Sequence, residues 1–484
     1  MFQTSRGTAA RPSNTNLRSQ NFTAEALGRG NGSAHDAHDA RFREGSVLSG
    51  HEGSTVGILR MEGYIHNGLM VTPGILPDGE SGRTGINPKH FVEICWASSS
   101  RASSVVNLLW PVVPVAITLS YIRPDLHLAC FILNYIAMVP CANLIGFAGA
   151  EAARKLHKVM GILLETTLGS VVEIIVFMVL IKNEQYQVIR AAILGSILAT
   201  QLLCLGLCFA FGGIRHDEQE FDEAVGEVGS DLLLTAGFGL IVPAAFYAAV
   251  RAGPSDTNPE LLADKVLHIS RCTAILLIVS YCIYVFFQMR THESIYDTIF
   301  EQDELQHSER HGAHFSENGE ETQIEHEKLT FTECVFALTV AITLVTVISI
   351  SLVTRISFIV EERGVSDAFI GLILVPLVEK FAEHLTAINE AWNNEMNMAL
   401  AHVLGATIQT SLFNGPLVVL VGWGLNKPMD LNFDLFNIIV LILAILVVGN
   451  FLRDQKSNYL EGSLCVIVYI NIAAAVYWYP SPEA

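Results

Sequence analysis

Two pairs of segments decide how this chain folds. The first pair is GSVVEIIVFMVLIKN at 169–183 with AAILGSILATQLL at 191–203, and the second is EKFAEHLTAINEAWNN at 379–394 with ALAHVLGATIQTSLF at 399–413. A single offset of 210 residues (383 − 173), without gaps, aligns one pair with the other. Among the identities that it matches are Glu173 with Glu383, Asn183 with Asn393, Ala191 with Ala401, Leu194 with Leu404, Gly195 with Gly405, Leu202 with Leu412 and Gly212 with Gly422. Such self-similarity predicts an internal repeat.

The repeat lies in a chain that is apolar enough to reside in a bilayer. Its 484 residues are 51% hydrophobic and only 16% charged. Because a helix needs about 20 apolar residues to cross the hydrocarbon, the recurring apolar runs predict an all-α polytopic membrane protein with about eleven transmembrane helices. The expected spans are 105–122, 127–148, 159–181, 187–213, 230–251, 267–289, 331–354, 366–390, 396–424, 433–452 and 461–479.

The position of the repeat predicts its topology. The first copy occupies the third and fourth expected spans and the second copy the eighth and ninth, so equivalent helices cross the membrane in opposite directions. We therefore expect two inverted-topology repeats of five helices plus one extra N-terminal helix. Inverted repeats place a binding site near the midplane and allow two conformations to exchange its access, which is typical of secondary transporters.

Polar segments divide the chain. The expected parts are a disordered cytosolic N-terminal tail (1–104), transmembrane helices 1–6 with the first repeat (105–290), an acidic cytosolic linker (291–330) and helices 7–11 with the second repeat (331–484). The linker carries eleven Asp or Glu, five His and two Lys or Arg, which is typical of a solvated connection or of a low-affinity regulatory cation site. Arg154, Lys155 and Lys158 favour a cytosolic position for the loop between spans two and three.

Two acids in the middle of predicted membrane helices are the candidate metal ligands. An ionised carboxylate at the bilayer centre costs about 2.5–3.5 kcal/mol on insertion scales, so Glu173 and Glu383, at equivalent places in the two repeats, indicate a site. Carboxylates bind hard cations together with hydroxyl, amide and backbone oxygens, and they bind protons instead when the cation leaves. Mutually exclusive occupancy is sufficient for exchange when the site faces each side in turn.

Other polar residues of the motifs form a possible additional cation or proton site. They are Glu165, Ser170, Ser196, Glu379, Lys380, His384 and Gln409. Glu165 lies within about 80° of Glu173 on a helix, and Lys380 lies one turn from Glu383. An ammonium group there takes electrostatically the place of a monovalent cation, which predicts weaker divalent binding. The alternative is that Glu379 and Lys380 compensate each other as a structural pair.

These segments resemble the cation/proton exchanger family, the calcium/proton exchangers of the calcium/cation antiporter superfamily, as a divergent member similar to fungal and plant proteins. GSVVE and LGSILAT are similar to the family's GNATE-type and LGSILSN-type motifs. The second half carries FIGLILVPLVEKFAEHLTAI, LGATIQTSLF, GWGLNKPMDLNF and DQKSNYLEGSL, and span six carries ISRCTAILLIVSYCIYVFFQMRTH. The chain departs from the pattern where Ser170 and Lys380 replace an Asn and Glu379 replaces a Gly.

The resemblance implies an eleven-helix antiporter that exchanges a cation, first of all Ca²⁺, for protons at the two motif glutamates, usually in a vacuolar membrane. The alternatives are a divergent monovalent cation/proton antiporter and a transport-inactive regulatory membrane protein. We expect a transporter rather than an enzyme, with no cofactor, since the chain lacks HExxH and covalent-catalysis motifs. The expected partners are lipid, the transported cations and protons, with no nucleic acid; protein partners stay open.

Overall fold

The computed structural model describes residues 64–66, 69–71, 85–98, 100–156, 158–253, 258–291 and 329–479. These residues are mostly helical, which confirms the predicted all-α membrane fold. Their strands form two short antiparallel pairs: β1 (Tyr64–His66) with β2 (Leu69–Val71), and β3 (Glu218–Glu220) with β4 (Lys456–Asn458).

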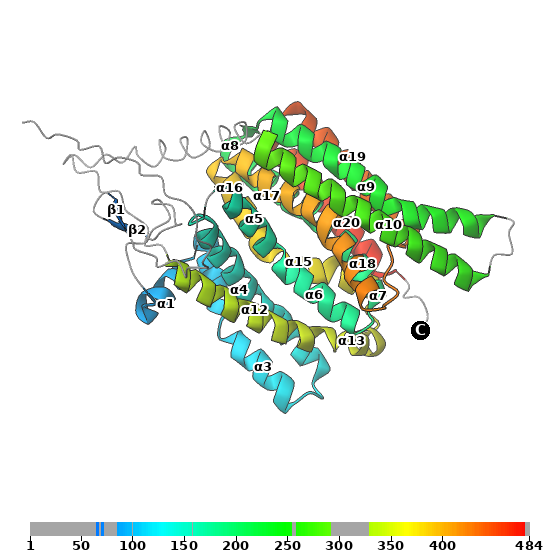
Figure 1. The fold of residues 1–484 in the computed structure, drawn as a ribbon, viewed down its shortest axis with the longest axis horizontal. Helices are drawn as coiled ribbons and strands as arrows, with labels where there is room; N and C mark the ends of the chain where they lie inside the picture. The colour runs from blue at the N-terminus through cyan, green and yellow to red at the C-terminus, as the bar shows by residue number, and fades with distance from the viewer. Residues whose placement is uncertain are drawn as a thin grey trace, which may run out of the picture. The chain divides into compact units, whose positions relative to one another are not determined.

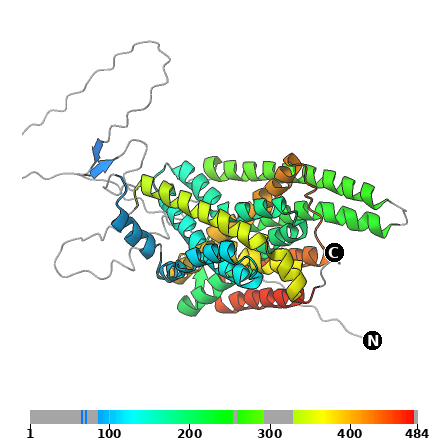
Figure 2. The ribbon, with the colours of Figure 1, turned by 90° about the horizontal axis from the view of Figure 1, so that it is seen from below.

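The helices fall into two groups on either side of the linker. Before it lie α1 (Pro88–Ala97), α2 (Arg101–Val106), η2 (Asn107–Leu109), α3 (Val112–Ile122), α4 (His127–Ala153), α5 (Lys158–Gly169), α6 (Val171–Lys182), α7 (Tyr186–Leu198), η3 (Ala199–Cys204), α8 (Leu205–His216), α9 (Glu223–Ala252), α10 (Pro259–Phe286) and η4 (Phe287–Thr291). After it lie α12 (Phe331–Val353), α13 (Ile356–Arg363), α14 (Asp367–Phe369), η5 (Ile370–Leu374), α15 (Val375–Glu379), α16 (Phe381–Asn393), α17 (Met396–Gln409), η6 (Thr410–Asn414), α18 (Gly415–Gly424), α19 (Leu435–Phe451), η7 (Leu452–Asp454) and α20 (Tyr459–Tyr477). Figures 1 and 2 show α9 and α10 side by side as a long pair, and α12 lying along α4.

Nine helices in the described ranges are long and apolar enough to cross a membrane. The expected spans 159–181 and 366–390 are not continuous helices, because each is broken once. The breaks fall at Ser170 (φ −90°, ψ −1°) and Lys380 (φ −94°, ψ 1°), which lie 210 residues apart (380 − 170) and share one backbone conformation. Hydropathy does not reveal these breaks, since the segments on both sides are apolar; the number of eleven crossings stays a prediction.

Contacts between loops define two faces of the helical bundle. On face A, the Gln219 Nε2 after α8 donates to Ala391 O (2.9 Å) and to Asn394 Oδ1 (3.0 Å) at the end of α16. On face B, Lys427 after α18 forms an ion pair with Glu184 after α6. The long helix from Tyr186 to His216 begins just after Glu184 and ends just before Gln219, so faces A and B lie at its opposite ends. Because α6 ends at face B and α16 ends at face A, the two motif helices run in opposite directions. The predicted inversion of the repeat is thereby confirmed.

The N-terminal tail is shorter than the sequence suggested, since helix α1 and the first residues of α2 lie within the predicted disordered part. Ile94 of α1 is buried in a cluster with Ala152 of α4, with Leu329 before α12 and with Cys334 in α12. The backbone N–H of Asn87 donates to Glu333 Oε1 at 3.1 Å. Apolar surface from α4 and α12 thus stabilises α1, a segment with too few apolar residues to form a core of its own. Most of residues 1–84 and of the acidic linker lies outside the described residues.

Candidate functional site

The two motif glutamates meet at one ammonium group. The Nζ atom of Lys380 lies 2.9 Å from Glu173 Oε2 and 3.2 Å from Glu383 Oε2. Lys380 and Glu173 are inaccessible, with 0% and 1% of their side chains exposed, whereas Glu383 is 25% exposed. The sequence placed Lys380 beside Glu383; the structure adds that it bridges to the carboxylate of the other repeat.

The helix breaks bring these acids together. Glu173 lies in the first turn of α6 and Glu383 in the first turn of α16, immediately after the breaks at Ser170 and Lys380. A helix N-terminus exposes free backbone N–H groups and carries a partial positive charge, which stabilises a carboxylate inside the bilayer. Half-helices that begin at the midplane are also how inverted-repeat transporters build an ion site. Two such N-termini, from opposite directions, converge here.

Glu173 has two further donors that the sequence analysis did not identify. Thr410 Oγ1 lies 3.0 Å from Glu173 Oε2 and 3.2 Å from Oε1, and Asn414 Nδ2 donates to Oε2 at 2.7 Å. Both donors belong to η6, a π-helical segment, and the other repeat has the π-helical segment η3 at the corresponding place. Such segments are frequent at functional sites. The identity of Thr200 and Thr410 at the 210-residue offset was the available signal.

Glu379 forms a second buried acidic position beside the first. Its Oε1 accepts a hydrogen bond from Ser196 Oγ of α7 at 2.5 Å. Its Oε2 is buried and has no hydrogen-bond partner among the described residues. The predicted additional residues Glu379 and Ser196 therefore contact each other, next to the bridge made by Lys380.

Three other predicted residues lie near this centre without contacting the carboxylates. Ser170 and His384 are buried, and neither Ser170 Oγ nor His384 Nε2 has a hydrogen-bond partner in the described ranges. Gln409, buried at the end of α17, forms no hydrogen bond to either motif glutamate within the described part of the chain. Their roles as ligands stay predictions.

Glu165 belongs to a separate cluster on the side of face A. Its Oε1 lies 3.8 Å from His402 Nε2, and the other ring nitrogen of His402, Nδ1, lies 2.8 Å from Glu390 Oε2. The three side chains come from α5, α17 and α16. The break at Ser170 separates Glu165 from Glu173, so the two do not share the face of one continuous helix, which corrects that expectation. Glu165 pairs with His402 instead of the central bridge, and its part in an additional site stays a prediction.

The two repeats differ in how tightly they are closed. A Cβ atom at Gly195 in α7 would lie 2.3 Å from the backbone oxygen of Leu372 in η5, so the two backbones pack directly against each other between the centre and face B. At the equivalent Gly405 in α17, a Cβ atom would meet no atom of the described residues within 4 Å. Together with the exposure of Glu383 and the burial of Glu173, this indicates a centre closed toward face B and open toward face A.

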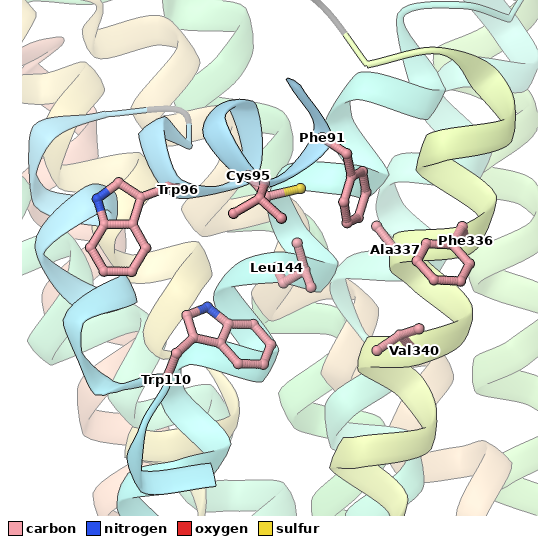
Figure 3. Close-up of a pocket in the computed structure, with 9 residues that line it drawn as sticks. Phe91, Cys95, Trp96, Trp110, Leu144, Phe336, Ala337 and Val340 are labelled. Carbon is pink, nitrogen blue, oxygen red and sulfur yellow. The ribbon is translucent and has the colours of Figure 1, made fainter. Parts of the chain in front are cut away.

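A cavity of about 330 Å³ lies apart from this centre, between α1, α4 and α12. Figure 3 shows Phe91, Cys95 and Trp96 of α1 above it, with Trp110 and Phe336 at its sides. Its lining is almost entirely apolar, so it provides no ligand for a cation. Among the described residues, no group of three or more His, Cys, Asp or Glu side chains has the geometry of a metal cage. A cation at the centre would rely on Glu173 and Glu383 with neutral oxygens such as that of Thr410.

Comparison with known proteins matches most of this chain to a known family. Residues 126–290 and 334–478 match the family described as "Sodium/calcium exchanger protein". A vacuolar calcium ion transporter of Cryptococcus neoformans var. grubii is 32% identical over 417 residues, covering 73% of this chain and 69% of that protein. Vacuolar cation/proton exchanger 2 of Arabidopsis thaliana is 32% identical over 385 residues, with 78% and 82% covered. The solved structure of native YfkE has a TM-score of 0.60 at 24% identity and covers 77% of this chain and all of that one.

Proposed function

Because this chain belongs to the sodium/calcium exchanger protein family, we propose that it exchanges Ca²⁺ for protons across a vacuolar-type membrane. The observation that carries the proposal is the meeting of Glu173 and Glu383, from oppositely directed helices, around one positive charge. Relatives named as vacuolar calcium ion transporters and as cation/proton exchangers support the choice of ion and membrane. We propose a transporter without a cofactor, whose partners are the lipid bilayer, the transported cation and protons.

The chemistry requires only that the two carboxylates hold either a cation or protons. Ca²⁺ takes six to eight oxygen ligands. Glu173 and Glu383 supply negative charge, while the hydroxyl oxygen of Thr410 and the side-chain amide oxygen of Asn414 supply neutral ligands. When the cation leaves, protons and the ammonium of Lys380 together compensate the two carboxylates, so the centre is not left with uncompensated charge inside the bilayer. The centre exchanges the two species across the membrane if it opens to face B after closing to face A.

A second candidate function is favoured by the same lysine. Lys380 already compensates both carboxylates, so a permanently retained bridge would give a transport-inactive membrane protein with a regulatory role. Displacement by a monovalent cation, the remaining alternative, would give a monovalent cation/proton antiporter.

Reconstitution of the full chain into proteoliposomes separates these functions. We expect an imposed pH gradient to drive uptake of ⁴⁵Ca²⁺, and we expect Glu173→Gln and Glu383→Gln each to abolish it. Glu361→Gln, at an exposed position of α13, is the matched control and leaves uptake unchanged. Uptake of ²²Na⁺ or ⁸⁶Rb⁺ in place of Ca²⁺ would select the monovalent antiporter. Absence of any proton-driven uptake by the intact chain would contradict the proposal and favour the inactive protein.

A further inference from the structure

Lys380 occupies the oxygen atoms that a transported cation needs. Its ammonium group contacts the Oε2 atoms of both Glu173 and Glu383. An incoming cation and this ammonium therefore compete for the same two carboxylate oxygens. Unlike a proton or a free cation, the ammonium is covalently tethered and returns as soon as the site empties.

Glu379 offers a place for the displaced ammonium. It immediately precedes Lys380, is buried, and has one oxygen, Oε2, without a hydrogen-bond partner in the described part of the chain. A buried carboxylate oxygen without a partner is unusual and costly. Ser196, through its hydrogen bond to Oε1, fixes the carboxyl group of Glu379 against α7.

The side chain of Lys380 can move between the two positions while its backbone stays in place. Lys380 sits at the break between α15 and α16, where its backbone N–H donates to Pro376 O and its carbonyl oxygen accepts from the His384 N–H, each at 3.0 Å. Its ammonium is carried on a flexible four-carbon stem, so it can change partners by rotamer changes alone. The equivalent position in the other repeat, Ser170, is uncharged, so of the two repeats only the second carries this ammonium.

We propose that Lys380 is a tethered competitor of the transported cation: its ammonium bridges Glu173 and Glu383 when the site is empty and transfers to Glu379 when a cation binds. This inference rests on the proposed function, and it assigns to the Glu379–Lys380 pair the setting of cation affinity. Charge is conserved in the transfer, because an ion pair with the motif glutamates is replaced by one with Glu379.

Calcium binding to the purified full chain, measured by isothermal titration calorimetry in detergent with CaCl₂, tests the competition. Lys380→Asn removes the competitor, and we expect the Kd for Ca²⁺ to fall at least tenfold. Lys380→Arg keeps a tethered cation and should stay within a few-fold of the natural chain. Lys427→Asn, which removes a lysine from the loop on face B, is the matched control and should leave the Kd unchanged. A purely structural lysine would weaken binding or destabilise the protein when replaced; an unchanged or raised Kd in a folded Lys380→Asn protein overturns the proposal.

The second carboxylate is tested by a double-mutant cycle. Glu379→Gln removes the acceptor of the displaced ammonium, so we expect it to raise the Kd for Ca²⁺ at least tenfold while Lys380 is present. In the Lys380→Asn background the same change should have little effect, since no ammonium has to be accepted. Equal effects in both backgrounds would show that Glu379 acts independently of the lysine and would overturn the transfer. Thermal unfolding of each variant without Ca²⁺ identifies proteins that do not fold, and Lys380→Gln then replaces Lys380→Asn.

Failure of this inference is distinguishable from failure of the proposed function. Suppose that the natural chain binds Ca²⁺ more weakly than Lys380→Asn but that neither protein moves Ca²⁺ in exchange for protons. The inference that Lys380 competes with the cation is then supported, and the proposed exchange function is contradicted. If proton-driven Ca²⁺ uptake is robust and both proteins bind Ca²⁺ equally, the exchange stands and the competitor fails. If neither protein binds Ca²⁺, removal of the ammonium has not freed the site and the competitor fails.

Discussion

The contact between Gly195 and Leu372 predicts a conformational equilibrium that a single methyl group shifts. In the present state, a Cβ atom at Gly195 would lie 2.3 Å from the oxygen and 2.7 Å from the carbonyl carbon of Leu372, and both are backbone atoms. Overpacking of this kind costs about 1–3 kcal/mol, which corresponds to a shift of roughly 5–150-fold between two states. Gly195→Ala therefore disfavours closure toward face B. The methyl group of Gly405→Ala meets no described atom within 4 Å in this state. Because Gly405 is equivalent to Gly195, we expect this methyl group to clash, and to destabilise the protein, in the state that is open to face B.

Thiol labelling measures this shift. Thr386, one turn after Glu383 and exposed, is replaced by Cys in a chain whose exposed Cys272 and Cys282 are replaced by Ala. We expect a water-soluble maleimide to label this cysteine several-fold more slowly in Gly195→Ala and equally fast or faster in Gly405→Ala. Gly424→Ala, another site with nothing within 4 Å, is the control. Slower labelling in Gly405→Ala, or no change in either variant, would refute reciprocal closure of the two repeats.

Two other predictions concern the surroundings of the centre. Thr410→Val and Asn414→Leu each remove hydrogen bonding to the Glu173 carboxylate. Because a hydrogen bond to a charged group contributes about 1.5–3 kcal/mol, each change should raise the Ca²⁺ concentration for half-maximal uptake by tenfold or more. An unchanged concentration for half-maximal uptake would show that η6 is not part of the site. Gly462→Ala places a Cβ atom 2.2 Å from the backbone nitrogen of Ala210 in α8. We expect the free energy of unfolding to fall by about 1–3 kcal/mol, which is measured as a lower Tm than that of Gly424→Ala. Equal Tm values for the two variants would contradict this packing.

The sequence was sufficient for the parts of the site that the repeat encodes. The same offset of 210 residues aligns the surroundings of Glu173 and Glu383, and their places in the third and eighth expected spans, five spans apart, predict opposite directions. The offset also pairs Ser170 with Lys380, the two breaks, but neither residue type announces a break within an apolar run. The helix interruptions therefore required the three-dimensional structure.

Contacts between the repeats were beyond sequence reasoning for a physical reason. Thr410 and Asn414 serve Glu173, which lies 237 and 241 residues away, and their partner is decided by packing rather than by local pattern. Likewise, α1 is held by apolar surface from α4 and α12, so its own composition resembles a disordered segment. Glu165 was placed beside Glu173 from one helix, but the break at Ser170 separates the two residues.

Proton release on calcium binding tests most directly whether Glu173 and Glu383 form one centre that holds either species. The purified chain is mixed with CaCl₂ in weakly buffered detergent solution containing a pH indicator, with Glu361→Gln as the matched control. We predict that Ca²⁺ releases protons from the natural chain and the control, and that Glu173→Gln and Glu383→Gln each reduce both binding and release. Calcium binding without proton release, or equal release from the two glutamine variants and the natural chain, would contradict a shared centre.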